Sequence, residues 1–108
     1  MSSHEAIPQG GKIIVRVDPD LEDLIPDFLE MRREDVRSLS KALEKGDYKT
    51  IEILGHSMKG SGGGYGFDKI TEIGRSIEDA AKVPDAGKIK KMTEELKIYL
   101  ERVDVVYS

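Results

Sequence analysis

Four consecutive stretches of this 108-residue chain repeat apolar residues every three or four positions, and short breaks separate them. The stretches span about residues 26–45, 48–63, 67–83 and 86–103. Such spacing places apolar side chains on one face of an α-helix. Four amphipathic helices with short connections predict an all-α fold, namely an antiparallel, up-down four-helix bundle.

The side chains that we expect in the core of this bundle share the helical spacing. They are Phe28, Leu29, Val36, Leu39 and Leu43 in the first stretch, Ile51, Leu54 and Met58 in the second, Phe67, Ile70, Ile73, Ile77 and Ala81 in the third, and Ile89, Met92, Leu96, Tyr99, Leu100 and Val103 in the last. A chain of this length can form one such core. We therefore expect a single bundle.

The breaks between the stretches carry residues that end and begin helices. Gly46 suits the position just after a helix, where a left-handed backbone is common, and Asp47 suits the N-cap of the next helix. The glycine-rich segment Gly62–Gly66 ends the second helix. Pro84 follows the third helix, and Asp85 is a candidate N-cap for the last one.

The sequence divides into a tail at residues 1–17 and the helical domain at residues 18–108. Within the tail, residues 12–17 form a β-branched run that favours an extended strand, but one strand cannot form a sheet alone. Its only candidate mate is residues 103–107 at the other end of the chain. Either these segments pair, or both pack on the bundle as extended or helical tails. The pattern assigns no role to the extension.

A short extra helix is expected where the helical domain begins. Asp18 or Asp20 can cap it, and Pro19 suits its first turn. Pro26 then interrupts the pattern, because proline lacks an N–H donor and clashes with the preceding turn. We expect a kink or a new start of the helix there.

The composition excludes several classes of function. There is no cysteine and there are only two histidines, which argues against disulfides, thiolate catalysis and zinc sites. Lys and Arg total 17 against 21 Asp and Glu, a net charge of −4 that argues against nucleic-acid binding. No apolar run is long enough to span a membrane, and no signal peptide is apparent. We therefore expect a cytoplasmic protein.

The second stretch carries one histidine on its polar side. At about 100° per residue, His56 lies about 160° from both Leu54 and Met58, so it faces water when those two face the core. Ile53 lies on the shoulder of the exposed face, where a partner could bury it. The residues within about 60° of His56 on the helical wheel are Lys49, Glu52, Lys59, Gly60 and Gly63.

Several glycines interrupt this helix at a price in stability. Each interior glycine costs about 1 kcal/mol relative to alanine, so Gly55, Gly60, Gly62 and Gly63 together cost ~3–4 kcal/mol. Gly60 lies one turn after His56 on the same side, where a missing Cβ lets another molecule approach the imidazole. The other glycines either permit close contact between helices or mark a fraying helix end.

The residues around His56 fit phosphoryl transfer. A neutral imidazole has a free nitrogen that can act as a nucleophile near neutral pH. Lys59 can neutralise phosphoryl oxygens, since this chemistry depends mainly on positioning and electrostatics; its alternative role is an ordinary solvated charge. Glu52 has two interpretations: it is an ordinary i,i+4 neighbour of His56, or it is a catalytic group.

Other charged groups are interpreted as surface charge. The pairs Glu78-Asp79 and Glu94-Glu95 are expected on exposed helix faces rather than in acid–base catalysis. Arg32, Arg33 and Arg37 are expected on a solvated face balanced by nearby carboxylates. An acidic partner surface is the alternative reading of this arginine cluster.

The segment Leu54–Ser61 (LGHSMKGS), followed by Gly66-Phe67 and the helical Ile73–Ala81, resembles the histidine-containing phosphotransfer (HPt) domain. The resemblance covers about residues 20–104. It implies that His56 is reversibly phosphorylated by the aspartyl phosphate of a receiver domain and passes the group to another receiver aspartate. It also implies that Lys59 assists transfer of the phosphoryl group and that Gly60 gives a partner steric access to His56.

The same resemblance implies a phosphoryl carrier with no kinase activity of its own, no bound ATP and no cofactor, the Mg²⁺ belonging to the receiver. Its expected partners are response-regulator receiver domains, with a hybrid sensor histidine kinase as a further candidate. We expect docking around Glu52, Ile53, Gly60 and Gly63. Two alternatives stay open: a receiver-binding domain that carries no phosphate, and the phosphorylated histidine domain of a chemotaxis-type kinase.

Overall fold

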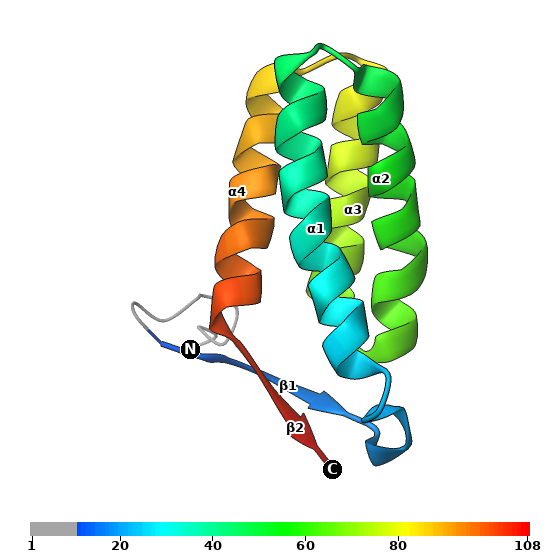
Figure 1. The fold of residues 1–108 in the computed structure, drawn as a ribbon, viewed down its shortest axis with the longest axis vertical. Helices are drawn as coiled ribbons and strands as arrows, with labels where there is room; N and C mark the ends of the chain where they lie inside the picture. Colours follow the sequence, from blue (N-terminus) through cyan, green and yellow to red (C-terminus); the bar gives the residue numbers. More distant parts are fainter. Residues whose placement is uncertain (1–10) are drawn as a thin grey trace.

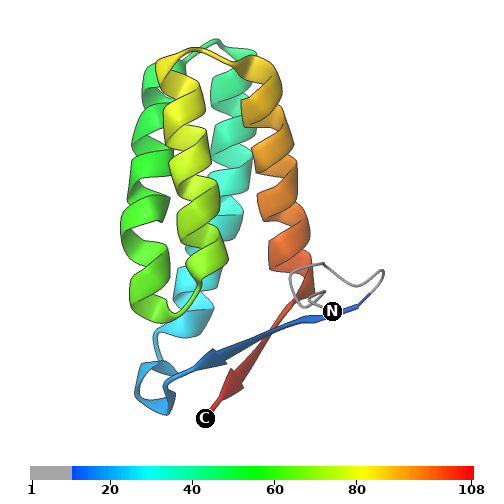
Figure 2. The same ribbon diagram turned by 180° about the vertical axis from the view of Figure 1, so that it is seen from behind.

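The computed structural model describes residues 11–108, and four α-helices make up most of this part of the chain. The helices are α1 (Ile25–Glu44), α2 (Tyr48–Gly62), α3 (Asp68–Lys82) and α4 (Ala86–Arg102). They lie side by side along the long axis of the molecule (Figure 1). The α1–α2 and α3–α4 connections share one end, and the α2–α3 connection lies at the other (Figure 2). The predicted four-helix, mostly helical fold is confirmed.

The helix boundaries follow the predicted capping residues. Gly46 has a positive φ of 67°, which a residue without a Cβ adopts without strain. The Asp47 side chain accepts a hydrogen bond from the backbone N–H of Thr50, and that of Asp85 accepts one from Lys88, each at 3.1 Å. These bonds satisfy N–H groups that the first turn of a helix leaves unpaired.

The extra N-terminal helix is shorter than expected. Only the 3₁₀ turn η2 (Pro19–Leu21) forms there, with the Asp18 side chain accepting a hydrogen bond from the Asp20 backbone. Pro26 lies in the first turn of α1, so its missing N–H breaks no helical bond. The few residues between the two prolines leave no room for an α-helix before α1 begins.

The two ends of the described chain pair with each other. Strand β1 (Ile13–Val17) runs parallel to β2 (Val103–Tyr107), with Ile13 opposite Val103 and Val17 opposite Tyr107. Figure 1 shows this sheet across the end of the bundle where α1 starts and α4 ends. An all-α description therefore misses one small parallel sheet. The assignment of Val103 to the last helix is wrong, since α4 ends at Arg102 and the backbone becomes extended.

Most of the predicted core side chains are buried, and the exceptions lie at the edge of the core. Those that are only half-buried against it are Val36, Leu43, Leu54, Met92 and Val103. Val17, Ile25, Ala42 and Ala80 join the core without having been predicted. Val17 brings β1 into the same core as the helices, so the extension packs on the domain.

An aromatic group holds the glycine-rich end of α2 against α1. The Phe28 ring lies 4.6 Å from the ring centroid of Tyr65 and 5.4 Å from that of Phe67. Tyr65 belongs to the 3₁₀ turn η3 (Gly63–Tyr65), and Gly66 follows it with a φ of 92°. The predicted end of the second helix near Gly62 is confirmed.

Candidate functional site

His56 lies in the middle of α2 and faces solvent. Its side chain is 70% exposed, whereas Met58 is fully buried and Leu54 is half-buried. The orientation predicted from the helical wheel is therefore confirmed. A solvent-facing imidazole is accessible to a second macromolecule, which a buried one would not be.

The imidazole has a carboxylate partner on the neighbouring helix. His56 Nδ1 lies 3.0 Å from Glu78 Oε2, and Lys59 Nζ lies 2.8 Å from Glu78 Oε1. The ammonium of Lys82 lies 3.9 Å from Glu78 Oε2. Glu78 thus joins a histidine and two lysines into one cluster, and the structure brings together His56 and Lys59 as expected.

The prediction that Glu78 is an exposed surface charge is wrong. Its side chain is only 8% exposed, because it lies on the edge of α3 that faces α2. Single-sequence reasoning placed it on a helix but could not say which helix it faces. The available signal was the spacing in α3: Gly74 and Ala81, four residues before and three after Glu78, lie on the same helix face, and both are buried.

The partners of Glu78 keep it ionised. The hydrogen bond from Lys59 lowers the pKa of Glu78 most strongly; burial opposes this, and the His56 hydrogen bond and the charges of Lys59 and Lys82 add to the lowering. An ionised carboxylate only accepts hydrogen bonds. We therefore assign the imidazole proton to Nδ1, which leaves the lone pair of the neutral ring on Nε2.

Three glycines allow α2 and α3 to approach through their backbones. An added Cβ would lie 2.6 Å from Glu78 N at Gly55, 2.7 Å from Thr71 Oγ1 at Gly62, and 2.6 Å from Lys59 N at Gly74. Real Cβ atoms do not come this close to other heavy atoms. Of the two explanations left open for the additional glycines, close helix contact is the correct one for Gly55 and Gly62. Gly74 was not singled out from the sequence.

Gly60 differs from these glycines, since an added Cβ there would meet no atom within 4 Å. Nothing in the packing of the described residues requires glycine at this position. A Cβ at Gly63 would make only an ordinary contact, 3.6 Å from Thr71 Oγ1. Because neither glycine has a side chain, no group projects from the helix surface one and two turns after His56.

The remaining predicted docking residues lie on the same helix. Ile53 is 57% exposed, and Glu52 is half-buried. Among the described residues, the carboxylate that the structure places at hydrogen-bonding distance from His56 is that of Glu78, not that of Glu52. Glu52 therefore flanks the site as a neighbour on the helix.

A shallow groove of about 270 Å³ between α1 and α2 lies on the Ser57 side of the site. Two large apolar side chains on its wall, Leu24 and Met31, are 50% and 55% exposed. Sequence reasoning missed both, because Met31 lies off the core stripe of α1 and Leu24 immediately precedes that helix. The signal for them is that they are apolar at positions where an amphipathic helix usually carries polar residues.

Arg32 lies at the floor of this groove, and its assignment to a solvated face is wrong. The side chain is 5% exposed, pairs with Asp35 at 2.8 Å and donates a hydrogen bond to Ser61 Oγ at 2.8 Å. Its guanidinium also lies over the Phe28 ring, 5.2 Å from the centroid. Arg32 therefore ties α1 to the turn of α2 that follows His56.

Residues 11–108 contain neither a candidate metal cluster nor a candidate membrane-spanning helix. No cluster of three or more histidine, aspartate or glutamate side chains is arranged to hold a metal ion. None of the helices in this part of the chain combines the length and the apolar character needed to cross a bilayer.

Comparison with known proteins gave one match. The model of the family described as Hpt domain matches residues 23–105, which is most of the chain and includes all four helices. No curated protein and no solved structure matches the sequence.

Proposed function

Because the chain belongs to the Hpt domain family, which serves phosphotransfer in two-component signalling, we propose that it carries a phosphoryl group on His56. The group comes from the aspartyl phosphate of one receiver domain and passes to an aspartate of another. The observation that carries the proposal is an exposed imidazole whose Nδ1 is held by the buried carboxylate of Glu78.

This geometry supports the following transfer step. Nε2 of His56 attacks the phosphorus, an N–P bond forms, the P–O bond to the receiver aspartate breaks, and that aspartate leaves as a carboxylate. The ring keeps its proton on Nδ1 and therefore becomes positively charged. Glu78, 3.0 Å from Nδ1, offsets this charge. The return step reverses the same bond changes.

Lys59 is the proposed partner of the phosphoryl group. The group brings about −1.5 to −2 charge, and transfer depends on neutralising that charge as it moves between oxygen and nitrogen. The Lys59 ammonium lies 2.8 Å from the carboxylate that holds His56. Its side chain is 34% exposed, so it can turn toward a group on Nε2.

The proposed docking surface surrounds His56 on α2 and continues onto α1. It comprises Glu52, Ile53, Gly60, Gly63, Leu24 and Met31. Exposed apolar side chains supply apolar area that a partner can bury, and the glycines supply access for a receiver active site.

We propose that the chain itself supplies no ATP site and no cofactor, and that the Mg²⁺ of the reaction is held by the receiver. A hybrid sensor kinase is a further proposed partner, and the proposed location is the cytoplasm.

The decisive experiment measures label transfer from a ³²P-labelled receiver to the protein. His56→Gln should fold normally, because the side chain faces solvent, and should accept no label. His4→Gln, at the only other histidine of the sequence, is the matched control and should accept label as the wild type does. Label on the His56→Gln variant would refute the proposal.

The two other classes of function predict different results. A phosphate-free binding domain would bind receivers yet acquire no acid-labile, base-stable phosphate on His56. The histidine domain of a chemotaxis-type kinase would be labelled by such a kinase with ATP rather than by a phosphorylated receiver. Parallel incubations with the two donors separate these outcomes.

A further inference from the structure

Gly55 of α2 and Gly74 of α3 face each other directly beneath the His56 cluster. We propose that this contact is a positioning device: it sets the helix separation at which Glu78 reaches both His56 and Lys59. The inference rests on the proposed role of His56. It assigns a function in phosphotransfer to two residues that touch no phosphoryl group themselves.

The α2 side of the contact adjoins His56 in the sequence. A Cβ at Gly55 would lie 2.6 Å from Glu78 N, 2.8 Å from Gly74 O and 3.1 Å from Glu78 Cα. The backbone of Glu78 therefore lies directly against the residue that precedes His56. No side chain separates the start of the glutamate from the helix that carries the imidazole.

The α3 side of the contact adjoins Lys59. A Cβ at Gly74 would lie 2.6 Å from Lys59 N and 2.8 Å from Gly55 O. One turn earlier in α3, Thr71 Oγ1 donates a hydrogen bond to Lys59 O at 3.2 Å. The backbone of α2 is thus held against α3 at Lys59, so the lysine and Glu78 start from fixed positions.

The contacts of Glu78 depend on the present separation of α2 and α3. Restoring an ordinary contact of 3.4 Å around a new methyl group at Gly74 or Gly55 requires backbone shifts of roughly 0.6–0.8 Å from the present 2.6–2.8 Å. With the side-chain rotamers unchanged, a shift of this size along the His56–Glu78 direction would lengthen that contact from 3.0 Å to beyond 3.5 Å, where a hydrogen bond is weak. The imidazole would then lose its fixed tautomer and orientation.

The test compares Gly74→Ala with Gly64→Ala, because a Cβ at Gly64 would meet nothing within 4 Å. The readouts are the Nδ1–H tautomer population of His56 by ¹⁵N NMR and the rate of label transfer from a receiver. Gly74→Ala should reduce that population and slow transfer about tenfold, as small misplacements of reacting groups do. Gly64→Ala should change neither. A folded Gly74→Ala protein with an unchanged tautomer would overturn the proposal.

A combined variant separates positioning from general packing. Gly74→Ala should slow transfer by less than about twofold when Glu78 is already replaced by alanine, since coupled residues are not additive. A full tenfold loss on that background would show that the glycine acts independently of Glu78, and would sink the proposal.

Glu78→Asp tests the same idea without crowding the interface, and covers a Gly74→Ala protein that fails to fold. The aspartate keeps the charge but is one methylene shorter, so it should reduce the Nδ1–H population and slow transfer as Gly74→Ala does. Unchanged values would show that reach is not limiting. The tautomer is measured without any receiver, so failure of His56 to accept phosphate leaves this test intact.

Discussion

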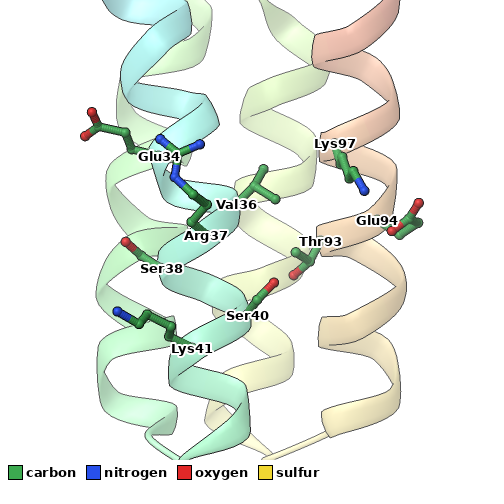
Figure 3. A pocket seen from close by; sticks show the side chains of 9 residues that line it. All are labelled: Glu34, Val36, Arg37, Ser38, Ser40, Lys41, Thr93, Glu94 and Lys97. Atoms are coloured by element: carbon green, nitrogen blue, oxygen red, sulfur yellow. The ribbon is translucent and has the colours of Figure 1, made fainter.

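The bundle packs differently on its two sides. Helices α2 and α3 meet through bare backbone at Gly55, Gly62 and Gly74. Between α1 and α4, in contrast, lies a surface groove of about 790 Å³ (Figure 3). The difference teaches that the polar cluster of His56 lies beside a direct backbone contact between α2 and α3, since short polar contacts across an interface need a fixed backbone separation.

The groove between α1 and α4 is lined mainly by charged side chains and a few small ones. Figure 3 shows Val36 and Ser40 of α1 and Thr93 of α4 lining the space between the two helices. The Thr93 hydroxyl donates to Ile89 O at 2.8 Å, within its own helix, rather than across to α1. This hydrogen bond therefore stabilises α4 itself and does not tie α4 to α1.

The largest effect is expected at the side chain that ties α1 to α2. Arg32→Ala should lower the free energy of unfolding by about 3 kcal/mol, because it leaves the half-buried Asp35 without its cation. Urea unfolding measures the change. Arg33→Ala removes an exposed arginine from the same helix and should change stability by less than about 0.5 kcal/mol. Equal effects of the two variants would show that α1 is not held by Arg32.

A methyl group should act differently on the two sides of the bundle. Gly62→Ala should destabilise by about 2 kcal/mol, because its Cβ would lie 2.8 Å from the backbone of Phe67 and Thr71. Ser40→Leu places a larger group in the open α1–α4 groove and should change stability by less than about 0.5 kcal/mol. Urea unfolding of both variants measures the change. A larger loss of unfolding free energy in Ser40→Leu than in Gly62→Ala would contradict the difference between the two sides.

Stability and transfer should separate at Gly60. Gly60→Gln should raise the free energy of unfolding by about 0.7 kcal/mol, because glutamine favours a helix and nothing lies within 4 Å of its Cβ. The same side chain should slow transfer from a receiver by blocking the approach to His56. Thermal unfolding and label transfer together test this; a stabilised variant with normal transfer would refute the access role.

The smallest expected effect is the contribution of Glu78 to the loss of stability at acidic pH. Folding lowers the pKa of Glu78, chiefly through the Lys59 hydrogen bond. The resulting stabilisation is complete above the usual carboxylate pKa of about 4.3 and is lost as the pH falls through the lowered folded value. Glu78→Gln should therefore lose less stability than the wild type as the pH falls from 5 to below the usual carboxylate value of about 4.3. We would measure the urea unfolding midpoint of both proteins at each pH. The same decrease of the midpoint with pH in the two proteins would contradict this prediction.

Much of the site could be predicted because it depends on one helix. The orientation of His56 and the open position of Gly60 follow from local spacing, and the caps at Asp47 and Asp85 follow from residue type. The role of Glu78 could not be predicted, because the face that a helix turns to its neighbour depends on packing between segments far apart in sequence. Arg32 was missed for the same reason.

The sequence by itself determined four amphipathic helices, their ends, and a histidine that must face water when its apolar neighbours are buried. Only the tertiary structure decided that β1 pairs with β2, and that Gly74 meets Gly55 so that Glu78 reaches His56. The physical reason is range. Helix spacing and capping act within a few residues, whereas strand pairing and backbone contact between helices join positions that only folding brings together.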